Sequence, residues 1–376
     1  MAIDKVTSAS ITDSSVTSAK VASGVLQPNF RNIIINGDMQ IAQRATSASS
    51  LTSSGYHALD RFRCVIVTAG TWTISQSTTV PSGQGFATSM KWDNTTADGS
   101  LGASDFVSVQ QFIEGQNLQY LKKGTSSAES LTVSFWVRSN KTGTYILELK
   151  DNDNTRAISQ SYTISSADTW EKKELTFAGD TTGTLDNDNA ASFLVQFALA
   201  AGSDYTSGSL QTSWGAETTA NRYVGQVNLA DSTSNEWYMT GLQVEVGTAA
   251  SDFEFLPVDV NLRRCQRYYQ KTYNQGVNPG TSTDVGATWE SGTSDNGGNV
   301  SILVQTKGSM RSTPTTAGYA RDGTSGSWYR RSNSNDGNAT VSFHMAGENS
   351  VSGYASIGSN WTAGLVAGHV TFDSEL

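Results

Sequence analysis

The segment 237–246 constrains the fold of this chain more than any other stretch. Its second half alternates strictly between two sets of residues, Leu242, Val244 and Val246 on one side and Gln243 and Glu245 on the other. Successive side chains of a strand point to opposite faces, so the pattern predicts a β-strand with one face on a hydrophobic core. We interpret it as the closing strand of a β-sandwich.

The residues after this strand predict a seam between two domains. Asp259 is positioned to cap a short helix over 260–266. Tyr268 and Tyr269 follow, and in a strand they would point to opposite sides. A closing strand, a crossing segment and a new strand within so few residues indicate that one sandwich ends here and another begins.

Short segments of strand character recur on both sides of this seam, separated by turn residues. The predicted strands are 32–39, 71–76, 87–92, 106–112, 130–138, 144–150, 159–164, 171–177, 192–199 and 222–228 before the seam, and 286–290 and 299–306 after it. Such spacing is typical of all-β sandwiches. The composition agrees, because 9 Trp, 13 Tyr and 13 Phe supply core side chains while long Leu/Glu/Lys helical patterns are absent.

Charge and apolar patterning exclude several classes of function. The net charge is −9 and no basic stripe is present, which disfavours nucleic-acid binding. No long apolar run occurs, so we expect neither a signal peptide nor membrane insertion. Cys64 and Cys265 lie far apart without metal-ligand spacing, so we expect two buried thiols in a protein made in a reducing cytoplasm.

Residues 1–30 contain a repeat with an unusual apolar period. Apolar residues recur every five positions, at Val6, Ile11, Val16 and Val21. One copy of this segment buries almost no apolar surface, so a flexible tail is one interpretation. Three copies wound about one axis would bury the stripe, and the repeat favours this second interpretation, an oligomerising stem or docking arm.

Several motifs at the start of the first domain and at the seam belong to one pattern. They are Asn32-Ile-Ile-Ile-Asn-Gly-Asp-Met39, Gln43-Arg44, Asp60-Arg61-Phe62, Gly241-Leu-Gln-Val-Glu-Val-Gly247, Phe253-Glu-Phe-Leu-Pro257 and Cys265-Gln-Arg-Tyr-Tyr269. The combination resembles bacteriophage tail-fibre and receptor-binding proteins. The strand Leu131-Thr-Val-Ser-Phe-Trp-Val-Arg138 and the segments after it resemble the jelly-roll carbohydrate-binding modules of polysaccharide hydrolases.

The resemblance implies an all-β protein in three parts. These are an N-terminal oligomerising arm (1–30), a jelly-roll β-sandwich (31–258) and a second, C-terminal β-sandwich tip domain (259–376). It further implies a homotrimer in the virion tail, assembled in the host cytoplasm, whose arm docks on other tail or baseplate proteins. Its distal loops would bind a host surface polysaccharide. Two alternatives stay open: a polysaccharide depolymerase, and a capsid-decorating or tail-adaptor protein of the same fold.

We expect no enzyme and no cofactor. The sequence contains no Gly-x-Ser-x-Gly, His-Glu-x-x-His or phosphate-loop motif, and its many Asp and Asn residues suit solvated turns. Related jelly rolls often hold a structural calcium ion, and Asn36, Asp38 and Glu245 occupy the comparable regions. For Asp38 we favour a simpler role, in which it satisfies turn backbone.

Sugar recognition requires exposed aromatic faces beside hydrogen-bonding groups. Trp214 lies in a Gly/Ser-rich loop where burial is difficult, and we predict the main receptor surface in residues 318–335. The candidate residues of that surface are Tyr319, Trp328, Tyr329, Arg330 and Arg331. Aromatic rings with guanidinium groups suit a neutral or anionic glycan. Strand alternation would nevertheless bury one of the two adjacent aromatics.

Overall fold

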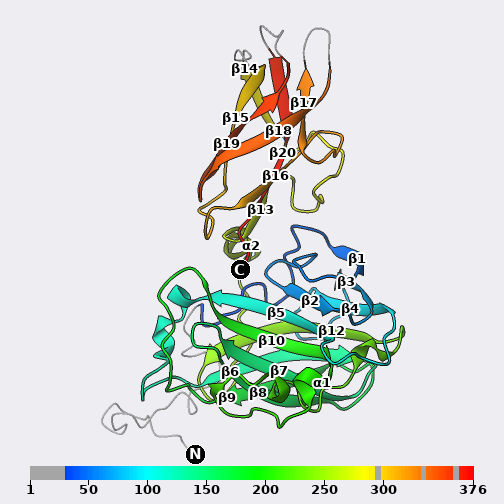
Figure 1. Cartoon of the computed structure of the whole chain (residues 1–376), viewed down its shortest axis with the longest axis vertical. Helices are drawn as coiled ribbons and strands as arrows, with labels where there is room; N and C mark the ends of the chain where they lie inside the picture. Colours follow the sequence, from blue (N-terminus) through cyan, green and yellow to red (C-terminus); the bar gives the residue numbers. More distant parts are fainter. Residues whose placement is uncertain (1–29, 293–297, 332–335, 359–363) are drawn as a thin grey trace, which may run out of the picture.

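The computed structural model describes residues 30–292, 298–331, 336–358 and 364–376, and most of its regular structure is β-strand. Figure 1 shows two β domains with the short helix α2 (Val258–Gln266) between them, and the C-terminus of the chain at the same level. The predicted all-β fold is confirmed. The apolar residues Val6, Ile11, Val16 and Val21 of the predicted arm lie outside the described residues.

The first domain consists of two six-stranded antiparallel sheets. In pairing order, the first sheet contains β1 (Ser47–Leu51), β3 (Thr71–Ser77), β4 (Ser89–Thr96), β12 (Glu236–Val246), β6 (Leu131–Ser139) and β9 (Glu171–Phe177). The second contains β11 (Gly215–Ala216), β8 (Arg156–Ile164), β7 (Gly143–Asp151), β10 (Ala191–Ala201), β5 (Phe106–Glu114) and β2 (Arg63–Val67). The strands predicted between residues 71 and 199 correspond to strands of these sheets.

Inward-facing residues of both sheets meet in one hydrophobic core. It includes Trp72 and Trp92, whose rings make an edge contact with centroids 5.7 Å apart, and Trp237 of β12. All three side chains are fully buried. Each large aromatic removes roughly 150–250 Å² from water, so these rings supply much of the hydrophobic stabilisation of the sandwich.

Strand β12 is buried on both faces, whereas the alternation predicted one covered face. Leu242 and Val244 lie in the core as expected, but Val246, at the end of the strand, is exposed. Gln243 and Glu245, on the opposite face, are buried as well. The segment 251–254 covers them: Glu245 accepts hydrogen bonds from the amide and hydroxyl of Ser251, and Gln243 Oε1 accepts one from the amide of Glu254. Buried polar side chains are tolerated here because they have hydrogen-bond partners.

The connection from β10 to β12 covers part of the outer face of the second sheet. It contains α1 (Ser203–Thr206), η5 (Thr219–Asn221) and η6 (Leu229–Asp231), and the strand predicted at 222–228 is instead irregular. Arg222 forms two hydrogen bonds of 2.6 and 2.8 Å with the Glu148 carboxylate of β7, and the buried Tyr223 hydroxyl donates to the same carboxylate. These tertiary contacts override the local strand preference.

The C-terminal domain is built around the long strand β20 (Gly364–Asp373). Its first half pairs with β14 (Thr288–Gly292) and β17 (Ser327–Arg331), and its second half pairs with β13 (Tyr269–Lys271) and β16 (Thr315–Tyr319). Beyond β17 the sheet continues through β18 (Gly337–Ala346), β19 (Ser350–Ser356) and β15 (Asn299–Gln305). A second hydrophobic core packs within this domain, and the strands predicted at 286–290 and 299–306 are confirmed.

Helix α2 begins at Val258 and is not capped by the side chain of Asp259, so the predicted cap is wrong. Pro257 holds the N-cap position, and Asp259 lies in the first turn, where its carboxylate interacts favourably with the helix dipole. Cys265 of this helix and Cys64 of β2 are buried free thiols, as predicted. Within the described ranges, no helix has the length and apolar character needed to cross a membrane.

The predicted strand 32–39 is instead a series of turns, held in place by side chains. Asn36 has a φ of 63°, and its side-chain amide donates to the carbonyls of Ile41 and Asp60 while its oxygen accepts from the Ile41 amide. Asparagine adopts this left-handed conformation more readily than most residues. The Asn-Gly signal was therefore interpreted correctly as a turn, but the residues before it do not form a strand.

Gln43 and Asp60 connect this turn region to the second domain. The Gln43 backbone and side-chain amides both donate to the Asp60 carboxylate, and the same side-chain amide donates to the carbonyl of Tyr269 at 2.8 Å. Burial raises the pKa of Asp60 to about 6, although the charge of Arg44 and the Gln43 hydrogen bonds act in the opposite direction. The carboxylate therefore keeps its charge near neutral pH only with these partners.

Two arginines hold the end of the chain between the domains. Arg61 is fully buried, forms an ion pair with Glu375, and places its guanidinium carbon 3.4 Å from the ring centroid of Tyr268. Arg44 contacts the same Glu375 carboxylate at 3.4 Å and lies 3.8 Å from the ring centroid of Tyr269. The two adjacent tyrosines are both buried, and each is covered by a different guanidinium.

Glu114, at the end of β5, makes a third contact across the seam. Arg267 donates two hydrogen bonds of 2.7 and 2.8 Å to its carboxylate, and the Tyr268 hydroxyl donates a further one. Burial alone would raise the pKa of Glu114, but these donors outweigh it, and the pKa lies below its usual value. The two domains are thus joined by charged groups that pair with one another across the seam.

We expect Tyr268→Ala to lower the free energy of unfolding by about 3–5 kcal/mol, because it removes a buried ring beneath a buried guanidinium. Tyr268→Phe is expected to cost about 1–3 kcal/mol, since only the hydrogen bond to Glu114 is lost. Urea denaturation measures both. Met345→Ala, at a side chain that is 79% exposed, is the control. A loss well under 1 kcal/mol for Tyr268→Ala would contradict a rigid seam.

Candidate functional site

Strand β17 shows which of the predicted receptor residues face solvent. Trp328 is fully buried in the core of the C-terminal domain, and its indole nitrogen donates to the carbonyl of His369. It fits there because Gly368 lies directly against its ring; a Cβ at that position would stand 2.3 Å from the indole. The prediction that Trp328 contacts a receptor is therefore wrong, because no face of its ring is accessible.

The neighbours of Trp328 follow the alternation of the strand. Arg330 lies on the same inward side and is half-buried, and it donates to the carbonyl of Ile357 at 3.2 Å. Tyr329 and Arg331 point to the other side, and Arg331 is exposed. Tyr319, at the end of β16, is half-buried and packs edge-on against Tyr273, with the ring centroids 6.1 Å apart.

An open groove of about 620 Å³ lies beside the outward face of β17. We call it the C-terminal groove. It is lined by the loop before β14, the turn between β16 and β17, and the start of β18; the residues are Ser282, Thr283, Asp284, Arg321, Asp322, Tyr329, Gly337 and Asn338. Figure 1 places β14, β17 and β18 in the domain that lies beyond α2 from the first sandwich. Of the predicted receptor residues, Tyr329 lines this groove.

Arg321 organises the C-terminal groove. Its guanidinium carbon lies 4.7 Å from the ring centroid of Tyr329 and 5.2 Å from that of Trp289, so it stands close to both aromatic rings. Asp284 accepts hydrogen bonds from two of its nitrogens and fixes its orientation. Trp289 is 46% exposed, which leaves ring surface available for contact. An arginine held over aromatic rings by a carboxylate is a preorganised polar and aromatic surface.

The acidic groups of the groove are held in their charged form. The hydrogen bond from Arg321 keeps the pKa of Asp284 below its usual value. The backbone N–H of Thr324 and the side chain of Asn338 do the same for the pKa of Asp322. Ionised carboxylates accept hydrogen bonds from hydroxyl groups, and a side-chain amide both donates and accepts them. The groove therefore combines aromatic surface with the polar groups that a sugar requires.

Trp214 belongs to the first domain and does not join this groove. It is half-buried: its indole nitrogen donates to the carbonyl of Ala178 at 2.7 Å, and its ring lies 6.2 Å from that of Phe193 in the core. Its remaining surface lines a separate groove of about 450 Å³ with Arg156 and Asp180. Arg156 and Asp180 form an ion pair there at 2.7 Å.

The three calcium candidates are engaged in protein hydrogen bonds. Asn36 binds backbone groups of its own turn, and Asp38 accepts from the side chain of Asn261 at 3.0 Å. Burial is the main influence on the pKa of Asp38 and raises it, while the backbone amide of Gln40 lowers it, which agrees with a role in the turn. Glu245 is covered by Ser251, as described above. Among the described residues, no group of His, Cys, Asp and Glu has an arrangement suited to a metal ion.

Sequence reasoning missed Asp284 and Asn338, which line the groove, and Trp289, whose ring lies beside Arg321. Trp289 stands in a predicted strand, and the alternation of that strand gives no indication of which face is covered. Asp284 and Asn338 are turn-type residues far apart in sequence. Asp284 precedes β14, which pairs with β20, and Asn338 lies on β18, which pairs with β17, so only the sheet brings them to the same groove. Arg321 lies inside the predicted range 318–335, and its positive charge on an acidic chain was the sequence feature that could have identified it as a binding residue.

No protein-family model matches this sequence, and a search of curated proteins finds no match. Among solved structures, the enzymatically active domain of tailspike protein 4 from bacteriophage CBA120 is similar at 13% identity and a TM-score of 0.30, over 58% of this chain and 22% of that chain. The family 11 carbohydrate-binding module of Clostridium thermocellum matches at 12% identity, TM-score 0.27, over 56% of this chain and 98% of the module.

A third similar structure is the xylan-binding domain CBM22-1 of Paenibacillus barcinonensis Xyn10C. It is 10% identical, with a TM-score of 0.24, and the match covers 55% of this chain and 99% of that domain. The chain thus spans about a fifth of the tailspike structure and nearly all of the two modules. Because these scores are low, the fold assignment rests on the strand order and packing of this chain.

We expect Trp328→Ala to lower the free energy of unfolding of the C-terminal domain by about 3–5 kcal/mol, the range for large aromatic truncations in cores. Tyr329→Ala, one residue away on the outward face, is expected to cost less than about 1 kcal/mol. Thermal unfolding of both variants checks this. Equal losses at the two positions would contradict the observed alternation.

Proposed function

We propose that this chain is a structural protein of a bacteriophage particle, a tail-fibre or receptor-binding subunit that attaches to a host surface polysaccharide. The observation that carries the proposal is the C-terminal groove, where Arg321 and Tyr329, together with the adjacent ring of Trp289, form one aromatic and cationic surface with exposed ring area. The groove belongs to the domain that lies beyond the seam from the first sandwich.

The motifs that resemble phage fibre proteins support the proposal, because they meet at one place in the structure. Gln43 binds Asp60 and the backbone of Tyr269, and Arg44 and Arg61 share the Glu375 carboxylate. These residues are distant in sequence, yet each motif supplies a partner to another. A connection made by several buried side-chain contacts suits a protein that must hold a binding surface away from its attachment point.

A binding role without hydrolysis fits the groove better than a depolymerase does. A glycosidase requires one carboxyl group with a raised pKa to act as general acid. The pKa values of Asp284 and Asp322 are instead lowered by hydrogen bonds to Arg321, Thr324 and Asn338. We therefore infer that the groove holds a glycan without cleaving it. Release of reducing sugar ends from host polysaccharide by the purified protein would contradict this.

The N-terminal arm completes the proposal. Residues 1–30 would form a trimeric stem that docks on other tail or baseplate proteins, through the apolar stripe of Val6, Ile11, Val16 and Val21. We expect deletion of residues 1–30 to abolish incorporation into virions and to reduce the trimer to monomer in sedimentation measurements. A deleted chain that still attaches to particles would rule out the docking role, whatever its oligomeric mass.

We expect Arg321→Ala to reduce adsorption of phage to host cells at least about tenfold, because it removes the charge-assisted contacts of the groove and frees Asp284. The melting temperature should change little, since Arg321 is only partly buried. If the host glycan is anionic, added salt should weaken the remaining adsorption of the unaltered protein.

Arg331→Ala is the matched control, since Arg331 is an exposed arginine of β17 that does not line the groove. Its adsorption should equal that of the unaltered protein. Unchanged adsorption of Arg321→Ala, or losses that follow the melting temperature alone in both variants, would remove the groove as the receptor site.

A further inference from the structure

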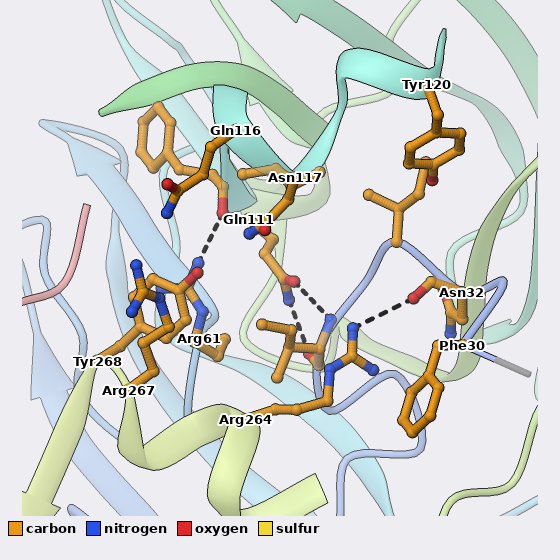
Figure 2. A pocket seen from close by; sticks show the side chains of 14 residues that line it. Phe30, Asn32, Arg61, Gln111, Gln116, Asn117, Tyr120, Arg264, Arg267 and Tyr268 are labelled. Atoms are coloured by element: carbon orange, nitrogen blue, oxygen red, sulfur yellow. Dashed lines mark hydrogen bonds between the residues drawn. The ribbon is translucent and has the colours of Figure 1, made fainter. Parts of the chain in front are cut away.

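A second cavity, independent of the C-terminal groove, lies at the seam between the two domains. Its volume is about 400 Å³, within the range of roughly 300–1,000 Å³ that ligand pockets occupy. Figure 2 shows its walls: helix α2 on one side, the turns η3 (Gly115–Asn117) and η4 (Gln119–Leu121) on another, and the segment that begins at Phe30 on a third. We call it the seam pocket.

Three arginines line the seam pocket, and two of them are neutralised by carboxylates. Arg61 pairs with Glu375, and Arg267 pairs with Glu114 through two hydrogen bonds. Figure 2 shows both guanidinium groups at the same side of the pocket, beside Tyr268. Each of these two arginines already has a carboxylate partner, so both belong to the domain connection described above.

The third arginine, Arg264, has no such partner. Its Nη2 donates to the backbone carbonyl of Asn32 at 3.2 Å, and within the described part of the chain no carboxylate lies within ion-pair distance of it. Glu254 exerts a favourable charge effect on Arg264, but its carboxylate is occupied by the amides of Phe30 and Asn32. Figure 2 shows the Arg264 side chain extending from α2 toward the middle of the pocket.

The position of Arg264 is energetically unfavourable without an anion. Burial lowers its pKa from the usual value of arginine, although a guanidinium stays charged at any physiological pH. A carboxylate strongly stabilises a partly buried cation that lacks a counter-ion. With a guanidinium it forms charge-assisted hydrogen bonds, which are often bidentate. The chain as a whole carries a net charge of −9, so this unpaired positive charge stands out against its surroundings.

The rest of the pocket offers contacts for a ring with hydroxyl groups. Tyr120 is 50% exposed and Phe30 is 61% exposed, so both rings present apolar surface at the rim. Gln116 and Asn117 are exposed amides on the same turns, and amides bind hydroxyl groups as donor and acceptor. Figure 2 shows Asn117 and Tyr120 on the wall opposite α2.

From this arrangement we propose that the seam pocket binds a sugar residue that carries one carboxylate, with Arg264 holding the carboxylate and Tyr120 or Phe30 packing against the ring. One unpaired guanidinium matches one negative charge, which favours a carboxylate over a phosphate group of nearly two charges. The proposal does not depend on the C-terminal groove, since the two sites share no residue.

The test is a calorimetric or saturation-transfer titration of the full chain with D-glucuronate, with D-glucose and sodium sulfate as comparison ligands. We expect glucuronate to bind and glucose and sulfate to bind at least about tenfold more weakly, because each lacks either the charge or the ring. Arg264→Gln should weaken glucuronate binding at least about tenfold. Raised salt should weaken it in the unaltered protein.

Two matched variants keep the result interpretable. Arg263→Gln changes the exposed neighbour on α2, which bonds the backbone of Lys307, and it should leave glucuronate binding unchanged. Arg321→Gln disrupts the C-terminal groove and should also leave it unchanged, so failure of one site does not imply failure of the other. Equal binding of sulfate, equal loss in Arg263→Gln, or retained glucuronate binding in a folded Arg264→Gln would overturn the assignment.

Discussion

The arrangement of this molecule depends on a guanidinium–carboxylate pair that is buried between its two domains. Arg61 comes from the first domain and Glu375 from the last residues of the second, and both are almost completely removed from water. Such a pair gains little stability over a hydrophobic contact, but losing either partner leaves a buried charge, which costs about 3–5 kcal/mol. The pair therefore specifies how the domains meet more than it strengthens them.

The groups around the Arg61–Glu375 pair allow only one arrangement of the two domains. Arg44 binds the other oxygen of Glu375, and Tyr268 and Tyr269 each lie beneath one guanidinium. Glu114 accepts hydrogen bonds from the Tyr268 hydroxyl and from the Arg267 guanidinium. A slip of one residue in β13 would exchange the faces of the adjacent tyrosines and break both arrangements at once. The relative position of the two domains follows from this network.

The seam between the domains affects both proposed binding sites, the C-terminal groove and the seam pocket. It sets the C-terminal groove at a fixed place relative to the first sandwich, and it leaves Arg264 as the one arginine of the seam pocket without a carboxylate among the described residues. Two such sites on one chain would contact different parts of a polysaccharide. Linked weak contacts of this kind raise the overall affinity far above that of either site, provided that the geometry allows both to bind together.

The sequence by itself determined the all-β class, most strands of the first sandwich and the burial of one of two adjacent aromatics, because these depend on local period and turn residues. It did not determine which aromatic is buried. Gly368 and Gly318, distant in sequence, make the space that Trp328 fills, so Tyr329 remains outside. The tertiary structure alone decided that 32–39 and 222–228 are irregular, that Gln243 is covered, and that Arg321 meets Trp289, because each depends on partners supplied by remote segments.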